Sequence, residues 1–565
     1  MENNPIRVEN KLEGTLDWEL NNPATNREIE GYGSLTSVSV NKNINLFVNT
    51  SSPKFSITIY RMGWYNGKGG RLIKKVENIT GTKQSIPAPD TETGLIDCDW
   101  TNPTTLQIPL DWTTGVYVAK LEESKNQKQS YIIFTVKDNT KKSEILFQLP
   151  VTTYQAYNFW GGKSLYDWGS GAPKNWGTKT GARANKVSFN RPYACSNNKK
   201  AAYGAGAGEF FTNIQPVTTH FFPISSASWD FNMVRWLEKN EYNVSYITNI
   251  DTHESPENIN NTKTFMSHGH DEYWSSQMRI NVENALSNTI NLAFFSSNTM
   301  FWQVRMEESK VTKDKNRILV CYKDALLDPI KDHNTTINFR DNPVNNPESK
   351  LIGVQHFMDP VDGDVIITKE DHWIFQGTTL KNGDKIKGLL GYEIDGTTDY
   401  SPKQIEVLTS SSTKNLIEDN YMYSLKTIFQ KIENKFGCNF SIHNWFLPAI
   451  IFTIVSAITI LALVIFSLLG TLATTLFSIS TILVASLFFY FTKKQVSTIN
   501  KTLSKKGTSN ITIYSTKNNA KVFASGTMQW SWGLDDFNAP NLRSSRLNKD
   551  AQIITKNILD NFTKE

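Results

Sequence analysis

Residues 446–492 contain no charged side chain, although the rest of the chain is polar and rich in aromatic residues. One crossing of a hydrocarbon core of about 30 Å requires about 20 helical residues. The run provides two such segments, 446–469 and 471–491, with Gly470 between them. Neither segment shows the polar face that a surface helix of a globular protein carries. The sequence therefore predicts a transmembrane helical hairpin and a membrane-attached protein.

Lysines on both sides of this run indicate its orientation. Lys431 and Lys435 precede it, and a group of lysines follows it at 493–506. Two crossings return the chain to its starting side, and positively charged flanks favour the cytoplasm. The first residues, MENNPIRVENKLEG, lack the apolar core of a classical signal peptide. We therefore predict a multi-pass membrane protein with two spans and its large polar parts in the cytoplasm.

Charge and cysteine usage exclude several classes of partner. The net charge is only +5 with 20% charged residues, so no polybasic surface argues for nucleic acid. The cysteines, Cys98, Cys195, Cys321 and Cys438, lie far apart and form no CxxC pair. This spacing indicates neither a zinc ribbon nor a disulfide framework, so isolated buried thiols are the expected state.

Residues 1–142 show the pattern of an all-β domain. Short runs with alternating apolar residues, such as INLFVNT, FSITIYRMGWY and GVYVAKLE, are separated by turn clusters. Strand-length runs at this regular spacing are typical of a β-sandwich. A linker at 137–142, rich in Lys, Asp and Asn, ends the domain.

From residue 143 the pattern changes to alternating strands and helices. EILFQLPV, YNVSYITNID, TKTFMSHGH and INLAFFSSN read as strands, and MVRWLEKN and SSQMRINVENALSN read as helices. This alternation predicts parallel βαβ units with functional residues at the carboxyl ends of the strands. We assign 143–410 to this α/β domain and 411–507 to an insertion that carries the hairpin. Residues 508–565 are predicted to complete the α/β domain.

The densest cluster of reactive side chains is the segment SHGHDEYWS at 267–275, between a predicted strand and a predicted helix. Its reactive members are His268, His270, Asp271, Glu272 and Tyr273. Together they offer metal ligands, a general base and a phenolic donor. The alternative is helix capping by Ser275 or Asp271, with the histidines bonded to loop carbonyls.

A second candidate is the aromatic segment YQAYNFWGGKSLY at 154–166, which follows the strand EILFQLPV. Tyr154, Tyr157, Asn158 and Trp160 suit the wall of a pocket for a small polar ligand. Packing between the sandwich and the α/β domain explains the same residues equally well.

Other strands end in further candidates for the same rim. These are Asp251 to Glu254, Asn298 after two serines, Glu393 in GYEID, and Trp530 in QWSW. Solvated loop structure is the alternative for the first of them. The pattern G-x-S-x-G is missing around Ser297, which argues against a serine triad.

Seven segments carry a resemblance to a known family: YRMGWYNGKGGRL, VTTYQAYNFWGGKSLY, MVRWLEKNEYNVSYITNIDTH, SHGHDEYWS, NLAFFSSNTMFWQVR, GLLGYEID and QWSWGLDDF. Together they resemble the family around the large (beta) subunit of N,N-dimethylformamidase, over nearly the whole chain except the apolar insert. The resemblance implies an α/β plus all-β fold. In it, an N-terminal Ig-like β-sandwich precedes a glutamine-amidotransferase-like α/β domain. The transmembrane helical hairpin, predicted from the uncharged run, is an insertion in that domain.

The resemblance also implies a cofactor and an activity. The characterised enzyme of the family hydrolyses a small amide with mononuclear iron held by two tyrosines and a glutamate. Carried onto this sequence, Tyr273 matches one tyrosine, whereas the position of the other is Phe231, which cannot bind iron. Glu393 resembles a supporting carboxylate, and no glutamate at 320–340 matches the third ligand. The substitutes in that stretch are Asp324, Asp328, Asp332 and His333.

A different ligand set follows from the residues themselves. His268, His270 and Asp271 with His253 offer nitrogen and oxygen donors that suit Fe, Zn or Mn. The predicted metal ligands are therefore Tyr273, His268, His270 and Asp271.

The leading hypothesis is a membrane-anchored, metal-assisted bacterial hydrolase of a small amide or a related C–N bond. Its predicted catalytic residues are Glu272, His270 and Glu393. Its predicted substrate-binding residues are Tyr154, Tyr157, Asn158, Trp160, Asn298 and Trp530. One alternative is a non-catalytic, membrane-tethered scaffold or ligand-binding protein, which the Phe231 position favours. Another is carbohydrate binding through Trp64, Tyr65 and Trp100. A partner subunit and a homo-oligomer both stay open.

Overall fold

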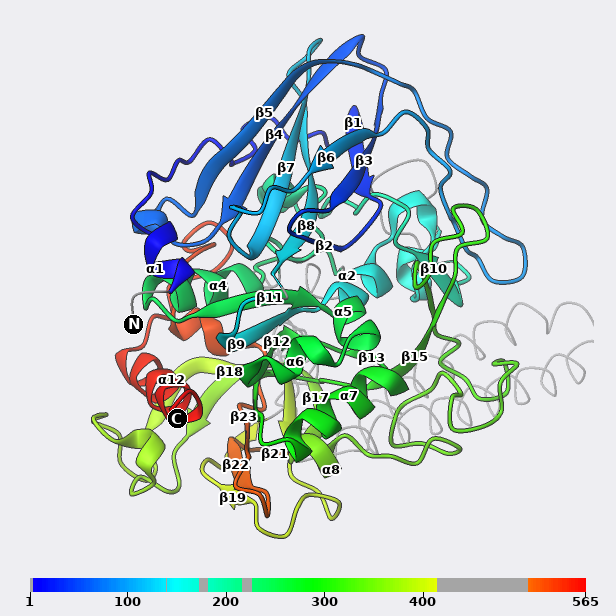
Figure 1. The fold of residues 1–565 in the computed structure, drawn as a ribbon. Coiled ribbons are helices and arrows are strands. Elements are labelled where there is room, and N and C mark those ends of the chain that lie inside the picture. The colour runs from blue at the N-terminus through cyan, green and yellow to red at the C-terminus, as the bar shows by residue number, and fades with distance from the viewer. Residues whose placement is uncertain (1–3, 139, 172–180, 216–225, 414–506, 565) are drawn as a thin grey trace, which may run out of the picture. The chain divides into compact units, whose positions relative to one another are not determined.

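The N-terminal strands form two sheets that share one hydrophobic core (Figure 1). The structure is a computed structural model that describes residues 4–138, 140–171, 181–215, 226–413 and 507–564. One sheet has the order β2-β8-β7-β4-β5 and the other β1-β3-β6. The strands are β1 (Ile29–Gly33), β2 (Ser37–Ser39), β3 (Asn43–Thr50), β4 (Lys54–Met62), β5 (Gly70–Thr80), β6 (Thr104–Gln107), β7 (Gly115–Glu123) and β8 (Gln129–Lys137). This all-β part agrees with the sequence pattern.

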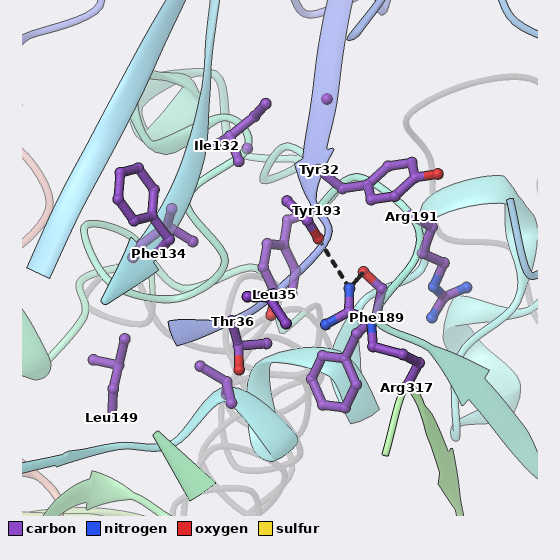
Figure 2. Close-up of a pocket in the computed structure, with 15 residues that line it drawn as sticks. Tyr32, Leu35, Thr36, Ile132, Phe134, Leu149, Phe189, Arg191, Tyr193 and Arg317 are labelled. Carbon is purple, nitrogen blue, oxygen red and sulfur yellow. Dashed lines mark hydrogen bonds between the residues drawn. The ribbon is translucent and has the colours of Figure 1, made fainter. Parts of the chain in front are cut away.

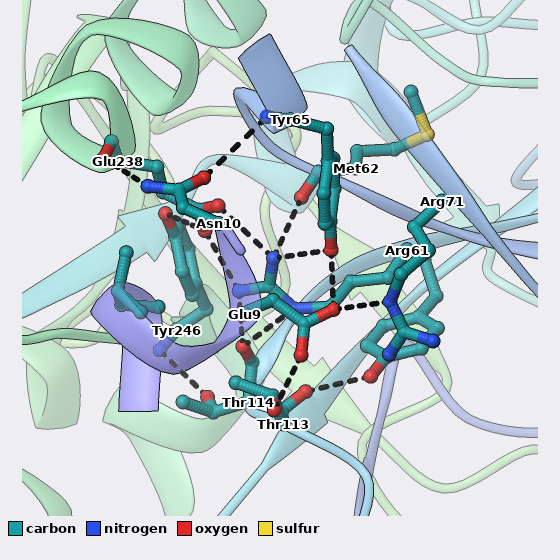
Figure 3. A network of polar contacts seen from close by, with 12 residues as sticks. Glu9, Asn10, Arg61, Met62, Tyr65, Arg71, Thr113, Thr114, Glu238 and Tyr246 are labelled. Carbon is teal, nitrogen blue, oxygen red and sulfur yellow. Dashed lines mark hydrogen bonds and ion pairs between the residues drawn. The ribbon is translucent and has the colours of Figure 1, made fainter. Parts of the chain in front are cut away.

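A buried polar network joins this part to the helix α4 (Asp230–Lys239) (Figure 3). Arg61 on β4 forms two hydrogen bonds to Glu238 on α4, at 2.7 and 3.0 Å. The first helix, α1 (Pro5–Glu9), enters the same network through Glu9, which accepts hydrogen bonds from Tyr65 and Arg71 at 2.6 Å. The network fixes α4, whose first residue, Asp230, lies next to the candidate site described below.

The α/β part is built on a central sheet with the order β11-β9-β12-β14-β23-β22-β19 among the described residues. The strands from β11 to β23 are parallel, and β22 and β19 are antiparallel to their neighbours. The bounds are β9 (Ser143–Leu149), β11 (Val244–Thr248), β12 (Thr262–His270), β14 (Asn291–Ser297), β19 (Glu406–Val407), β22 (Thr512–Ser515) and β23 (Lys521–Ala524). The predicted alternation of strands and helices is therefore present.

Amphipathic helices cover the sheet (Figure 1). α7 buries Met278, Val282 and Leu286 against Phe265 of β12 and Leu292 of β14 in one hydrophobic core. On α12, the Phe562 carbonyl accepts a hydrogen bond from Thr264 of β12. The helices that complete this part are α2 (Val151–Tyr157), α5 (Asn249–Glu254), α6 (Glu257–Asn260), α7 (Ser276–Ser287), α8 (Ser349–Ile352) and α12 (Lys549–Phe562).

Smaller sheets surround the central one. Their strands are β10 (Lys186–Ser188), β13 (Tyr273–Ser275), β15 (Trp302–Glu307), β16 (Ile318–Val320), β17 (Gln355–Ile366), β18 (Lys385–Gly396), β20 (Ser411–Thr413) and β21 (Gly507–Ser509). The short 3₁₀ helices are η1 (Tyr65–Gly67), η2 (Trp160–Gly162), η3 (Asp167–Gly169), η4 (Lys199–Gly204), η5 (Trp373–Phe375) and η6 (Gln529–Gly533). The pairing of β17 with β18 carries Glu393 toward the end of β14, since Ser297 donates a hydrogen bond to the nearby Asp395 at 2.5 Å.

Two local predictions can be compared with the structure. Both histidines of SHGHDEYWS lie within β12, which runs to His270, in agreement with the strand predicted for TKTFMSHGH, so only Asp271 and Glu272 lie between β12 and β13. The segment QWSW, expected to end a late strand, forms the 3₁₀ helix η6. The mixed α/β architecture does not test the more detailed predictions. These are the Ig-like and glutamine-amidotransferase-like assignments and the domain boundaries at 142, 410 and 507, and they stay predictions.

The predicted membrane localisation is corrected by the structure. In the described ranges, no helix is both long enough and apolar enough to cross a bilayer. Even α12, with 14 residues, extends only about 21 Å, and it exposes charged side chains on one face. The two-span localisation with cytoplasmic polar parts is therefore withdrawn. The predicted spans 446–469 and 471–491 lie outside the described residues.

Candidate active site

Three parallel strands place the candidate site at their carboxyl ends. β12 ends at His270, which is in register with Ser297 at the end of β14, and Asn298 follows. β9 leads into α2, whose last residue is Tyr157. Ligand sites of open α/β sheets lie outside these strand ends. The fold thus brings together residues that are far apart in the sequence.

His270 is the centre of a buried cluster. Its Nε2 lies 3.3 Å from Glu272 Oε2 and 3.5 Å from Glu393 Oε2. Its Nδ1 lies 3.1 Å from the Gln215 side-chain nitrogen. His270 exposes 2% of its surface, Glu272 3% and Glu393 5%. One imidazole therefore contacts two carboxylates that are shielded from water.

The two carboxylates next to His270 Nε2 have opposite pKa shifts. Burial raises the pKa of Glu393 well above its usual range, and the charges of Asp359 and Glu272 raise it further. Burial acts in the same direction on Glu272, but the hydrogen bond and charge of His270, with Lys323, outweigh it and lower the pKa of Glu272. The shifts favour the ionised form of Glu272 and the protonated form of Glu393. In such a separation the protonated carboxyl serves as an acid and the ionised carboxylate stabilises positive charge.

Three tyrosine hydroxyls form a chain that ends on Glu272. Tyr157 donates to Glu272 Oε2 at 2.7 Å, Tyr166 donates to the Tyr157 hydroxyl at 2.8 Å, and Tyr273 donates to the Tyr166 hydroxyl at 2.6 Å. Tyr166 also lies 3.3 Å from both oxygens of Glu272. Burial and then the charge of Glu272 raise the pKa of all three phenols well above the usual value. They are therefore hydrogen-bond donors at neutral pH.

Lys323 adds an amine to this chain of phenols. Its Nζ lies 3.3 Å from the ring centre of Tyr166 and 5.2 Å from that of Tyr273. This nitrogen is buried and has no hydrogen-bond partner among the described residues. Burial lowers the pKa of Lys323 to about 8. The ring faces attract the charged form of the amine, so both forms of Lys323 are accessible near neutral pH.

The backbone at the site adopts conformations that side chains rarely allow. Gly269 has φ 62°, and a Cβ atom there would lie 3.0 Å from Asp230 Oδ1 and 3.2 Å from Trp229 Cβ. Glycine therefore permits the start of α4 to approach β12. Asn298 (φ 52°) and Lys323 (φ 57°) are also left-handed. Backbone strain of this kind clusters at functional sites.

Comparison with known families identifies this arrangement. The profile of the family described as N,N-dimethylformamidase beta subunit-like, C-terminal, matches residues 56–544. The chain belongs to the N,N-dimethylformamidase beta subunit-like family. The match includes every residue of the cluster and confirms the resemblance seen in the sequence motifs. No curated protein matches the chain.

The iron ligand set that the family resemblance implies was two tyrosines and one glutamate. Tyr157, Tyr166 and Glu272 supply these groups, with the phenols 2.8 Å apart and 2.7 and 3.3 Å from the carboxylate. Phenolate and carboxylate oxygens are donors that iron accepts in proteins. The residues present therefore suit the metal, although they are not the ones carried over from the sequence. The hydroxyl of Tyr273 contacts Tyr166, one step further from Glu272.

Phe231, the position expected for the second tyrosine, lies in another environment. Its ring is fully buried and packs against Trp18, Phe211 and Phe537, with ring centres 5.6, 5.1 and 4.8 Å away. Its neighbour Asp230 instead faces β12. Successive helix residues point in different directions, so only one of the two can face the cluster. The phenylalanine therefore removes no ligand from the cluster around His270.

The alternative metal set is not brought together. His268 Nδ1 lies 3.1 Å from Asp230 Oδ1, and His253 Nδ1 lies 2.8 Å from Ser275 Oγ. Burial raises the pKa of Asp271 to about 6. Its carboxylate accepts hydrogen bonds from Gln148, Asn249 and Ser267. Within the described part of the chain, no group of three or more His, Cys, Asp and Glu side chains is placed to hold a metal ion.

Several predicted substrate-binding residues belong to the packed interior. Trp160 donates to Glu30 at 2.7 Å within an aromatic core, and Trp530 donates to Thr555 at 2.9 Å. The Asn158 side chain donates to the carbonyl of Pro192 at 2.9 Å. These three residues support the fold around the site.

The other predicted residues lie at or beside the cluster. Tyr157 belongs to the chain of phenols, and the Asn298 side chain is close enough to Glu393 to oppose its pKa rise. Tyr154 donates a hydrogen bond to Asp230 at the start of α4 and not to a member of the His270 cluster. Asp251, a proposed rim residue, is instead bonded to Ser37 at 2.7 Å and ties the α/β part to the first sheet.

Sequence reasoning missed several members of the cluster. Tyr166 lies in the aromatic segment that was singled out, nine positions after Tyr157, and the aromatic excess was its only signal. Lys323 follows β16 in a stretch without any local motif, and Gln215 and Glu209 are equally unmarked. Their role results from the three-dimensional arrangement alone.

The cavity in Figure 2 is separate from this cluster. It is lined by Ile132, Tyr193 and Arg317, among others, and has a volume of about 30 Å³. This space holds about two water molecules. Arg317 donates to the carbonyls of Gly33 and Phe189, each at 2.9 Å. The cavity is therefore too small for an organic substrate.

Proposed function

We propose that the protein hydrolyses the C–N bond of a small amide, in keeping with its family. The observation that carries the proposal is the pair of carboxylates with opposite pKa shifts next to His270 Nε2, at 3.3 and 3.5 Å. Amide hydrolysis needs a group that takes a proton from water and a group that gives one to the leaving nitrogen. The cluster contains both.

The roles of the residues follow from their protonation. His270 Nε2 takes the proton of the attacking water, whose oxygen bonds to the amide carbon, and the ionised Glu272 stabilises the imidazolium that forms. Glu393 gives its proton to the nitrogen as the C–N bond breaks. Tyr273 and Lys323 offer donors for the negative charge that develops on the carbonyl oxygen. Burial of the whole cluster strengthens these interactions because little water screens them.

An iron ion held by Tyr157, Tyr166 and Glu272 is part of the proposal. When bound, such an ion supplies a Lewis acid that polarises a carbonyl and acidifies water. The protein's own contribution is to bind it with phenol and carboxylate oxygens and to keep the surroundings buried.

The non-catalytic alternative rested on Phe231, and that ring lies in an aromatic cluster away from His270. Carbohydrate binding through the first sheets is not supported either, because Tyr65 and Trp100 expose only 1% and 4% of their surfaces. Hydrolysis is therefore the function that we retain.

The test is release of ammonia from formamide and acetamide, and of the methylamines from N-methylformamide and N,N-dimethylformamide, by iron-loaded protein. Glu272→Gln keeps the shape but removes the charge, and we expect kcat/KM to fall by about 10²–10⁴. The matched control is Glu77→Gln, because Glu77 is 60% exposed. Failure of the wild-type protein to release ammonia or amine from any of these amides would reject the proposal.

A further inference from the structure

The cavity in Figure 2 has a positively charged lining. Among the described residues that line it are two arginines, Arg191 and Arg317, and no aspartate or glutamate. Arg317 exposes 4% of its surface and Arg191 exposes 1%. Strands β1 and β8 of the first sheets and the start of α2 contribute further residues to the wall. Two buried cationic residues therefore border this space, and none of the described lining residues is acidic.

The guanidinium of Arg317 has donors to spare. A guanidinium carries five N–H groups and accepts no hydrogen bond. Nε donates to Asn190 Oδ1 at 2.8 Å, and Nη2 donates to the carbonyls of Gly33 and Phe189 at 2.9 Å each. Within the described residues, the two N–H groups of Nη1 have no acceptor. Figure 2 shows this guanidinium between Phe189 and Leu35, among the residues that line the cavity.

The charge of Arg317 is compensated only indirectly. Asp97 reaches it through Asn190, whose side-chain nitrogen donates to Asp97 Oδ1 at 3.0 Å. Burial lowers the pKa of Arg317 to about 10, and burial also lowers the pKa of Arg191 to about 10. Both side chains are still cations at neutral pH, and a buried cation without a counter-ion is unfavourable. An anion next to Nη1 would remove this penalty.

Tyr193 supplies a second donor to the same cavity. Its hydroxyl forms no hydrogen bond within the described part of the chain. Burial raises the pKa of Tyr193 and the positive charge of Arg317 lowers it, which places the two groups close together. The phenol is protonated at neutral pH and can therefore donate. Two donors without acceptors, one of them charged, thus border one small space.

We propose that this cavity binds a small monovalent inorganic anion of the size of chloride, held by Arg317 Nη1 and the Tyr193 hydroxyl. The volume of about 30 Å³ accommodates a halide ion but not a sulfate. Hydrogen bonds in which both partners are charged are stronger than those to neutral water, so the anion is favoured over water. Arg317 directly precedes β16 and Tyr193 follows β10, so a bound anion joins these two segments.

The direct test is diffraction from wild-type crystals grown in sodium bromide, measured at the bromine absorption edge. We expect an anomalous peak in the cavity, in contact with Arg317 Nη1. Bromide scatters anomalously at this edge and water does not. Ordered water without an anomalous peak in the cavity would overturn the proposal.

The second test is thermal unfolding in potassium chloride and in potassium gluconate at equal ionic strength. A ligand that binds only the folded protein raises the melting temperature. We expect a saturable rise with chloride and none with gluconate, which is too large for the cavity. Arg317→Met is expected to weaken chloride binding by about tenfold or more, since it removes a charged donor. Tyr193→Phe is expected to weaken it less.

The matched controls are Arg7→Met, because Arg7 is 47% exposed, and Tyr400→Phe, because Tyr400 is exposed. Both are expected to keep the wild-type response to chloride. An unchanged response in Arg317→Met, or no response in the wild-type protein, would overturn the proposal. If Arg317→Met does not fold, the bromide peak and Tyr193→Phe decide. Neither test uses an amide, so the result is independent of the proposed hydrolysis.

Discussion

Arg61 and Glu238 form a fully buried ion pair between β4 and α4, with Nη2 and Oε1 2.7 Å apart (Figure 3). Arg61 also donates to the Thr114 carbonyl at 2.8 Å, and Glu238 accepts from Tyr246 at 2.9 Å. A buried pair of this kind gains little over apolar packing, but breaking it leaves a charge without compensation. The pair therefore fixes the position of α4, which places Asp230, and Trp229 directly before it, beside β12.

Glu238→Ala leaves the Arg61 charge buried and unpaired, and we expect a loss of about 3–5 kcal/mol in the free energy of unfolding. Urea denaturation at pH 7 measures it. The control is Glu241→Ala, which breaks the exposed pair with Arg7. Exposed pairs contribute at most about 1 kcal/mol. Equal losses in the two variants would contradict the assigned role.

The buried amine of Lys323 predicts a pH-dependent stability. Burial lowers the pKa of Lys323 from 10.5 to about 8 in the folded protein. Between these values the unfolded chain holds the proton and the folded protein does not, so stability rises with pH across this window. Relative to Lys323→Met, the wild-type free energy of unfolding is expected to increase by about 2 kcal/mol from pH 7 to pH 9.5.

The comparison for Lys323 is made by urea denaturation at both pH values. Lys310, which is exposed, supplies the matched variant Lys310→Met. We expect its difference from the wild-type protein to be independent of pH. If Lys323→Met shows the same pH dependence as the wild-type protein, the Lys323 pKa is not lowered.

Elements whose structure follows from a local apolar pattern could be predicted from the sequence. β4 alternates buried and less buried residues over much of its length, and the predicted strand matches it. In the same way, α7 follows its apolar period, with Met278, Val282 and Leu286 buried. His270 and Glu272 were found because they are neighbours in the chain and crowd one strand end.

The rest of the site depends on pairing between distant segments. Glu393 reaches His270 only because β18 pairs with β17 beside the end of β14, and no local signal encodes this register. Trp160 and Trp530 resemble pocket aromatics in composition, yet their indole nitrogens bond to Glu30 and Thr555 in the interior. Aromatic pocket walls and aromatic cores have the same sequence signature, so only contacts separate them.

Phe231→Tyr is expected to destabilise the protein without adding a metal ligand. The new hydroxyl would enter the cluster of Trp18, Phe211 and Phe537. A buried hydroxyl without a partner costs about 1–3 kcal/mol in proteins. Thermal unfolding and iron analysis measure the two effects. A gain of iron together with a visible phenolate-to-iron absorption band would show that this position does reach the metal.

Single tyrosine variants separate ligands from their neighbours in the phenol chain. Tyr157 and Tyr166 lie 2.7 and 3.3 Å from the Glu272 carboxylate, whereas Tyr273 contacts the Tyr166 hydroxyl. We therefore expect Tyr157→Phe and Tyr166→Phe to lose bound iron and its phenolate absorption, and Tyr273→Phe to retain both. The exposed Tyr400 gives the matched control Tyr400→Phe. Because each variant removes one oxygen and little volume, iron loss confined to Tyr273→Phe would move the metal away from Glu272 and back to the ligand expected from sequence.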